Sequence, residues 1–162
     1  MSEPTPQPLE SLASSVEKMI RQIAQSLPEG VATLEVKRGS SCNPPVGFAL
    51  TPNRPSAARI HIDVDEQARI AFLAIGRGAV YEIPSDGRRY SDLSQLDELR
   101  ALCLAAVRGE FRETVSLKGH EVVGGRGYAT VGSQEVGDLW RRAFTNPLRL
   151  SKKRSFEYEP YD

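Results

Sequence analysis

The stretch GYATVGSQ, residues 127–134, separates two glycines by four residues, which is the glycine spacing of a phosphate-binding P-loop. In a P-loop the second glycine is followed by a Lys that contacts the phosphates and by a Ser or Thr whose hydroxyl holds Mg²⁺. Here Ser133 occupies the Lys position and Gln134 occupies the hydroxyl position. Because both side chains that carry the chemistry are missing, the stretch predicts a glycine-rich strand around Gly127 and Gly132 and no nucleotide hydrolase.

A histidine and two aspartates alternate in HIDVD, so His61, Asp63 and Asp65 project from the same face of a predicted strand. An imidazole and two carboxylates on one face could hold a divalent cation or act as a general base. The residues between them are apolar and claim the core face: Ile60, Ile62 and Val64. We therefore interpret the three polar residues as part of a solvent-exposed strand face.

Cys42 lies in the segment GSSCNPP, inside a long stretch rich in Gly, Ser and Pro that spans residues 38–56. A cysteine nucleophile needs a base, and the chain holds two histidines, His61 and His120. No family signature surrounds Cys42, and Cys103 falls on the apolar face of a predicted helix, so we interpret them as a loop thiol and a core residue. We expect no catalytic residues, no metal and no cofactor. The alternative hypothesis is a small hydrolase or metal-dependent enzyme that uses Cys42 or the histidine–aspartate strand face.

A basic block late in the chain contains no acidic residue and is followed by the acidic, aromatic end FEYEPYD. Such a block is either a solvated tail or a contact surface for an acidic partner or nucleic acid. The aromatic end is either disordered or lies as an extended arm on a partner or along the protein's own sheet edge. Because Arg and Tyr are frequent in interfaces, we predict partner-binding residues here and at the glycine-flanked Arg126. The predicted set is Arg126, Arg141, Arg142, Arg149, Lys152, Lys153, Arg154, Phe156, Tyr158 and Tyr161.

The composition is that of one globular domain of 162 residues. Basic and acidic residues balance at 21 each, so no net charge directs the protein to nucleic acid or to an anionic membrane. No apolar run reaches the roughly 18 residues that a membrane-spanning helix needs. The N-terminus is polar and acidic, unlike a signal peptide, and two cysteines are too few for a disulfide framework. These features predict a cytoplasmic protein.

Apolar residues recur at spacings of three and four in two segments, which predicts amphipathic helices over residues 8–27 and 92–108. The pair Asp92 and Gln95 is a capping-box pattern that begins the second helix. The segment SQEVGDLWRRAF, residues 133–144, predicts a short third helix. Alternating patterns predict strands at 31–37, 58–65, 69–76, 111–118 and 121–131, with further short strands at 46–50 and 79–84.

The predicted order α-β-β-β-α-β-β-α is that of an α+β domain, an antiparallel sheet packed on one face by the two amphipathic helices. The domain spans residues 8–148, between a flexible lead at 1–7 and a basic, then acidic-aromatic tail at 149–162. Since the strands are half polar, we expect the other face of the sheet to meet water or a partner.

This element order is similar to the layout of secretion-chaperone domains, and many small immunity proteins use comparable α+β layouts. The chain also offers few catalytic groups. We therefore expect a non-catalytic partner-binding protein, such as an immunity factor or a dedicated chaperone. It would bind another protein through the polar sheet face, the loop 38–56 or the C-terminal segment. Nucleic acid is the alternative partner, through the basic segment 141–154, and no membrane partner is expected.

Overall fold

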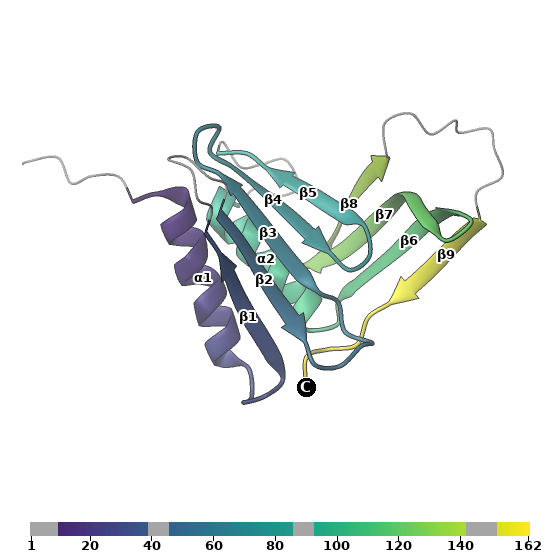
Figure 1. Cartoon of the computed structure of the whole chain (residues 1–162), viewed down its shortest axis with the longest axis horizontal. Helices are drawn as coiled ribbons and strands as arrows, with labels where there is room; N and C mark the ends of the chain where they lie inside the picture. The colour runs from purple at the N-terminus through teal and green to yellow at the C-terminus, as the bar shows by residue number, and fades with distance from the viewer. Residues whose placement is uncertain (1–9, 39–45, 86–92, 142–151) are drawn as a thin grey trace, which may run out of the picture.

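The computed structural model of the chain describes residues 10–38, 46–85, 93–141 and 152–162 (Figure 1). These residues form two helices and nine strands, arranged as two antiparallel sheets. In chain order the elements are α1 Leu12–Ser26, β1 Ala32–Lys37, β2 Val46–Pro52, β3 Ile60–Asp65, β4 Ile70–Ile75, β5 Ala79–Ile83, α2 Gln95–Val107, β6 Phe111–Lys118, β7 Glu121–Val131, β8 Gln134–Arg141 and β9 Lys152–Glu157.

Helix α1 forms where the apolar spacing predicts it. Its side chains at spacings of three and four are buried: Leu12, Val16, Met19, Ile20 and Ile23. The Ser11 hydroxyl accepts a hydrogen bond from the Ser14 amide at 3.1 Å, which satisfies one of the free amides of the first turn. Proline follows directly after Leu27 and stops the helix.

Helix α2 begins later than predicted. The N-cap is Ser94, whose hydroxyl accepts from the Asp97 amide. Asp92, which the capping-box pattern proposed for this role, lies outside the described residues. The helix ends before Gly109, whose φ of +72° is a left-handed conformation that favours glycine. A Cβ at Gly109 would also lie 2.7 Å from the Pro160 nitrogen, so glycine is required on both grounds.

The first sheet is a meander with strand order β1-β2-β3-β4-β5, all neighbours antiparallel. The predicted short strand at 46–50 is present and longer than expected, because β2 pairs with β1 on one side and β3 on the other. Phe48 and Leu50 face the core from β2 and are fully buried. The long loop predicted over 38–56 is therefore divided by a central strand of the sheet.

The second sheet has strand order β8-β7-β6-β9. The predicted helix over 133–144 is wrong, because residues 134–141 form β8, and every residue of β8 pairs with a residue of β7. Val131 and Gln134 are paired, so the turn between the strands contains two residues, and Gly132 adopts a φ of +62° in it. Such two-residue turns favour glycine at positive φ. Strand pairing in the hairpin therefore determines the structure of this segment, although the spacing of its apolar residues also fits a helix.

Strand β9 brings the C-terminal segment onto the edge of the second sheet, where it pairs antiparallel with β6. The C-terminal segment thus lies along the protein's own sheet edge, which is one of the arrangements predicted from the sequence. After β9, two tyrosines also pack against the body of the protein. Tyr158 stacks on Phe111 with 5.7 Å between ring centroids, and Tyr161 is buried. The Tyr161 hydroxyl donates a hydrogen bond to the Ala58 carbonyl.

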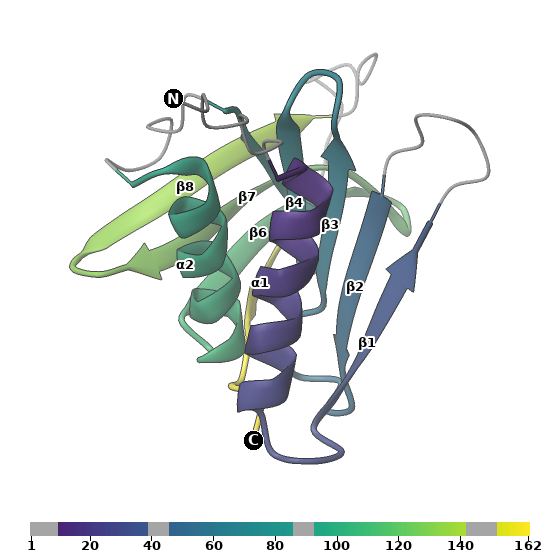
Figure 2. The same ribbon diagram turned by 90° about the vertical axis from the view of Figure 1, so that its left-hand side faces the viewer.

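The helices lie on the same side of the two sheets, as Figure 2 shows. Helix α1 packs against β1, β2 and α2, whereas α2 packs against β7 and also contacts β4 and β5. One hydrophobic core joins both helices and both sheets. The α+β class is confirmed, but the prediction of a single sheet covered by both helices is wrong, because the strands divide into two sheets that share the helices.

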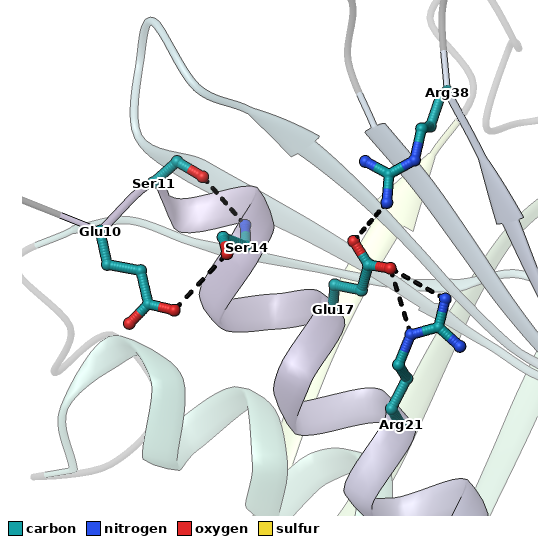
Figure 3. A network of polar contacts seen from close by, with 6 residues as sticks. All are labelled: Glu10, Ser11, Ser14, Glu17, Arg21 and Arg38. Atoms are coloured by element: carbon teal, nitrogen blue, oxygen red, sulfur yellow. Dashed lines mark hydrogen bonds and ion pairs between the residues drawn. The ribbon is translucent and has the colours of Figure 1, made fainter.

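An ion-pair network ties α1 to the end of β1 (Figure 3). The Glu17 carboxylate accepts from Arg21 at 2.9 Å and from Arg38 at 2.6 Å. These hydrogen bonds lower the pKa of Glu17 below its usual value. Because the arginines are largely exposed, we assign this network a role in orienting the chain and little stability.

Candidate functional site

The two glycines with P-loop spacing have structural roles. Gly132 forms the β7–β8 turn, and Gly127 lies where β7 crosses β5. A Cβ at Gly127 would clash with Ala79 and approach Phe111 to 3.1 Å. The glycines permit a tight turn and a close crossing of two strands, which accounts for their spacing without a phosphate.

The structure brings His61 and Asp63 together, with 3.1 Å between Nε2 and Oδ1, but does not add Asp65 to them. The Asp65 carboxylate instead accepts from the Ala68 amide at 2.9 Å in the β3–β4 turn. No group of three His, Cys, Asp or Glu side chains that could hold a metal ion occurs among the described residues. Cys42 lies outside them. What remains of this site is an exposed histidine–aspartate pair.

That pair belongs to the outer face of the first sheet, the face turned away from the helices. Alternation along the strands and the cross-strand register place these residues on it: Thr33, Glu35, Lys37, Gly47, Ala49, Thr51, His61, Asp63, Asp65, Ile70, Phe72, Ala74, Val80 and Glu82. Phe72 and Val80 are exposed large hydrophobic residues, at 36% and 37%. They are diagonal neighbours across β4 and β5, because Val80 pairs with Ala74, two residues beyond Phe72. The face therefore has an exposed apolar pair near one side of the sheet, on β4 and the edge strand β5.

Acidic residues flank Phe72, because Asp63 on β3 and Glu82 on β5 are its cross-strand partners. The outer face of the first sheet carries one basic residue, Lys37. Its acidic residues are Glu35, Asp63, Asp65 and Glu82. Gly47 lies opposite Asp63, and a Cβ there would approach the Asp63 carboxylate to 3.2 Å. A glycine at this position leaves room for the histidine–aspartate pair. The face as a whole is acidic with an exposed aromatic residue, although the chain has no net charge.

The predicted partner-binding residues do not form one surface. Along β9, Lys153 points to the same side of the second sheet as Arg126, since Ser155 on that side pairs with Thr114 and Thr114 with Arg126. The opposite side of the strand carries Lys152, Arg154 and Phe156. Tyr158 and Tyr161 are attached to the body of the protein. The side chain of Arg141, and all of Arg142 and Arg149, lie outside the described residues.

One aromatic ring, that of Phe156, lies between two arginines. The Arg77 guanidinium carbon is 4.4 Å from the ring centroid and that of Arg154 is 5.1 Å away, both cation–π contacts. Sequence analysis missed Arg77, although GRG at 76–78 repeats the arrangement of Arg126 between glycines. Arg154 and Phe156 were predicted as contact residues from the composition of the C-terminal segment. Arg77 joins them from the turn between β4 and β5, which is distant in the sequence.

A buried carboxylate holds that turn in place. Glu113 is 2% exposed and accepts from the Arg77 amide at 2.5 Å, the Gly78 amide at 3.1 Å and the Tyr158 hydroxyl. Burial and the neighbouring Glu113 carboxylate raise the pKa of Tyr158 above its usual value. Gly76 is required beside it, because a Cβ there would lie 2.5 Å from a Glu113 oxygen. The two sheets are joined here by a buried carboxylate that accepts hydrogen bonds from several donors.

The outer face of the second sheet, turned away from α2, is polar and has one aromatic residue at its centre. The residues on it include Arg112, Thr114, Ser116, Lys118, Glu121, Gly124, Arg126, Tyr128, Thr130, Glu135, Gly137, Lys153, Ser155 and Glu157. The Arg112 guanidinium carbon lies 4.5 Å from the Tyr128 ring centroid and also binds Glu135 at 2.9 Å. Sequence analysis singled out Arg126 but not its neighbours Arg112 and Tyr128, which the alternation in FRETVSLK and GYATV places on one face.

Comparison of the chain with protein-family models, with curated proteins and with solved structures found no match. Among the described residues, no helix is both long and apolar enough to span a membrane. Functional inference therefore depends on the two outer sheet faces and on the cluster around Phe156.

Proposed function

We propose that the protein is a non-catalytic binding protein, of the immunity-factor or dedicated-chaperone kind, and that the outer face of the first sheet binds a basic partner protein. The observation that carries the proposal is the exposure of Phe72 and Val80 as diagonal neighbours on a sheet face that no described helix covers. Exposed aromatic residues within a polar surface are typical anchors of protein interfaces.

Charge complementarity selects the kind of partner. The four acidic side chains and the single Lys37 give this face a negative field, which attracts a basic surface and raises the association rate at low salt. Small residues lie near Phe72: Ala74 is two residues along β4, and Gly47 is opposite Asp63, the β3 partner of Phe72. A partner that places an apolar side chain against Phe72 can therefore place its cations over the surrounding carboxylates.

Affinity purification of the tagged protein from its native host, with RNase and DNase treatment, tests the proposal. We expect a stoichiometric basic protein to copurify with the wild-type chain. Titration of the isolated partner should then show Phe72→Ser binding roughly thirtyfold more weakly, which is the effect of losing an interface anchor worth about 2 kcal/mol.

The matched control is Leu93→Ser, because Leu93 is a large hydrophobic residue of similar exposure, 38%, outside this face. It should leave the affinity unchanged. The proposal is wrong if a folded Phe72→Ser/Val80→Ser variant binds the same partner as tightly as the wild-type chain. It is also wrong if the only stoichiometric partner is acidic.

A further inference from the structure

We infer that the outer face of the second sheet binds single-stranded nucleic acid, with Tyr128 stacking on a base and the surrounding cations contacting phosphates. This surface differs from the one that binds a protein partner in the proposed function, and the inference does not depend on it. The sheet carries no helix on this face among the described residues, because α2 packs against the opposite side of β7.

The first observation is the position of Tyr128. It lies on β7, an interior strand, between Arg112 on β6 and Gly137 on β8. A Cβ at Gly137 would lie 3.1 Å from the Tyr128 ring, so the glycine leaves room for the ring on the sheet surface. The ring is half-buried and forms the only aromatic platform among the described residues of this face. Aromatic residues on open antiparallel sheets stack on unpaired bases, and each stack is sequence-tolerant because every base has a π-face.

The second observation is the charge around the ring. Arg126 and Lys153 are exposed and have no ion pair within the described part of the chain. Lys118 is also exposed and lies opposite Glu121 on β7. The Arg126 guanidinium donates to the Tyr128 hydroxyl at 3.3 Å, which places it at the edge of the ring. Hydroxyl groups lie between the cations, where Thr114 and Ser155 contact each other at 3.0 Å. Cations and hydroxyls at this spacing match the phosphates and sugars of a strand that crosses the sheet.

Arg112 does not block the ring. Its guanidinium lies over Tyr128, but it is held there by an exposed pair with Glu135, and both side chains are about half exposed. Exposed pairs of this kind are weak, so an incoming base can displace the guanidinium or stack on it. Among its described residues the face carries four basic side chains, Arg112, Lys118, Arg126 and Lys153, against three acidic ones, Glu121, Glu135 and Glu157, so its charge stays positive.

The ring and its position favour nucleic acid over an acidic protein. An acidic segment would need cations alone, whereas a base also uses the flat face of Tyr128. Along β7 the residues Arg126, Tyr128 and Thr130 alternate outward in the order Arg-Gly-Tyr-Ala-Thr-Val. In sheets that bind RNA, the strand that contacts bases has a basic residue followed by aromatic residues at alternate positions. Arg126 and Tyr128 match this pattern, and Thr130 stands at the position of the second aromatic residue.

The experiment measures fluorescence anisotropy of labelled 12-nucleotide RNA and DNA strands of mixed sequence, titrated with the whole chain at about 50 mM salt. We expect micromolar binding of the single strands and weaker binding of the matched duplex. Binding should weaken as salt is raised, because cation–phosphate contacts release counterions. Tyr128→Ala should weaken binding about tenfold or more, and Arg126→Ala should weaken it and reduce the salt dependence.

The controls separate this inference from the protein-binding surface and from loss of structure. Phe72→Ser should leave the affinity for the strands unchanged, and Tyr128→Phe should retain it, because the ring is kept. Thermal unfolding shows that each variant is folded. The inference is overturned if no strand binds, if Tyr128→Ala binds as tightly as the wild-type chain, or if polyglutamate competes as well as RNA does.

Discussion

Replacing Glu113 by alanine should destabilise the protein strongly, because one buried carboxylate satisfies three donors. These are the amides of Arg77 and Gly78 and the hydroxyl of Tyr158. A buried donor left without an acceptor costs about 1–3 kcal/mol. Since Arg77 is exposed and water can reach part of the turn, we take values near the lower end and expect a total loss of about 3–5 kcal/mol. That is a large part of the 5–15 kcal/mol by which domains are typically stable.

Urea unfolding followed by circular dichroism measures this loss. With a slope of about 2 kcal/mol/M, the midpoint of Glu113→Ala should fall by about 2 M. Glu113→Gln keeps the shape and one acceptor oxygen, so it should fall by about half as much. The control is Glu135→Gln, which removes an exposed carboxylate paired with Arg112 and should leave the midpoint almost unchanged, because exposed pairs are weak. The reasoning fails if Glu113→Ala is no more destabilising than this control.

Two further predictions concern buried titratable groups. Burial raises the pKa of Tyr158 and of Tyr161 above the ordinary value of 10.0, so both rings favour the native state while protonated. Their contribution to stability is complete below about pH 10 and is lost as the pH rises toward their native pKa values. The chain should therefore unfold in alkali. The double variant Tyr158→Phe/Tyr161→Phe should lose stability less steeply than the wild-type chain above about pH 10. Burial also raises the pKa of Cys103 to about 12, so in a Cys42→Ser background this thiol should not react with iodoacetamide near pH 8 until the chain is unfolded, and rapid labelling of the native state would contradict its burial.

The apolar patterns predicted the local elements well where one periodicity was unambiguous. The stripe from Leu12 to Ile23 formed α1. Strands β3 and β4 formed where they were predicted, and β3 has the predicted residues Ile60, Ile62 and Val64 inside. The pattern was ambiguous for 133–144, where the apolar residues fit either a helix or a strand. There the two-residue turn at Gly132 and the pairing with β7 decided for a strand.

In the strands that were predicted as strands, the sequence by itself determined which side is polar, because side-chain alternation is a local property. It placed His61 on the same side as Asp63, and Arg112 on the other side of its strand from Glu113. Only the tertiary structure decided which strands share a sheet. It separated Lys153 from Arg154, brought Arg77 to Phe156 across 79 positions of the chain, and left Phe72 and Val80 on a face that no described helix covers. These outcomes depend on non-local pairing, in which β9 joins β6 across the intervening strands β7 and β8. A contact between distant segments leaves no periodic signal in either of them, so no pattern along the chain could reveal it.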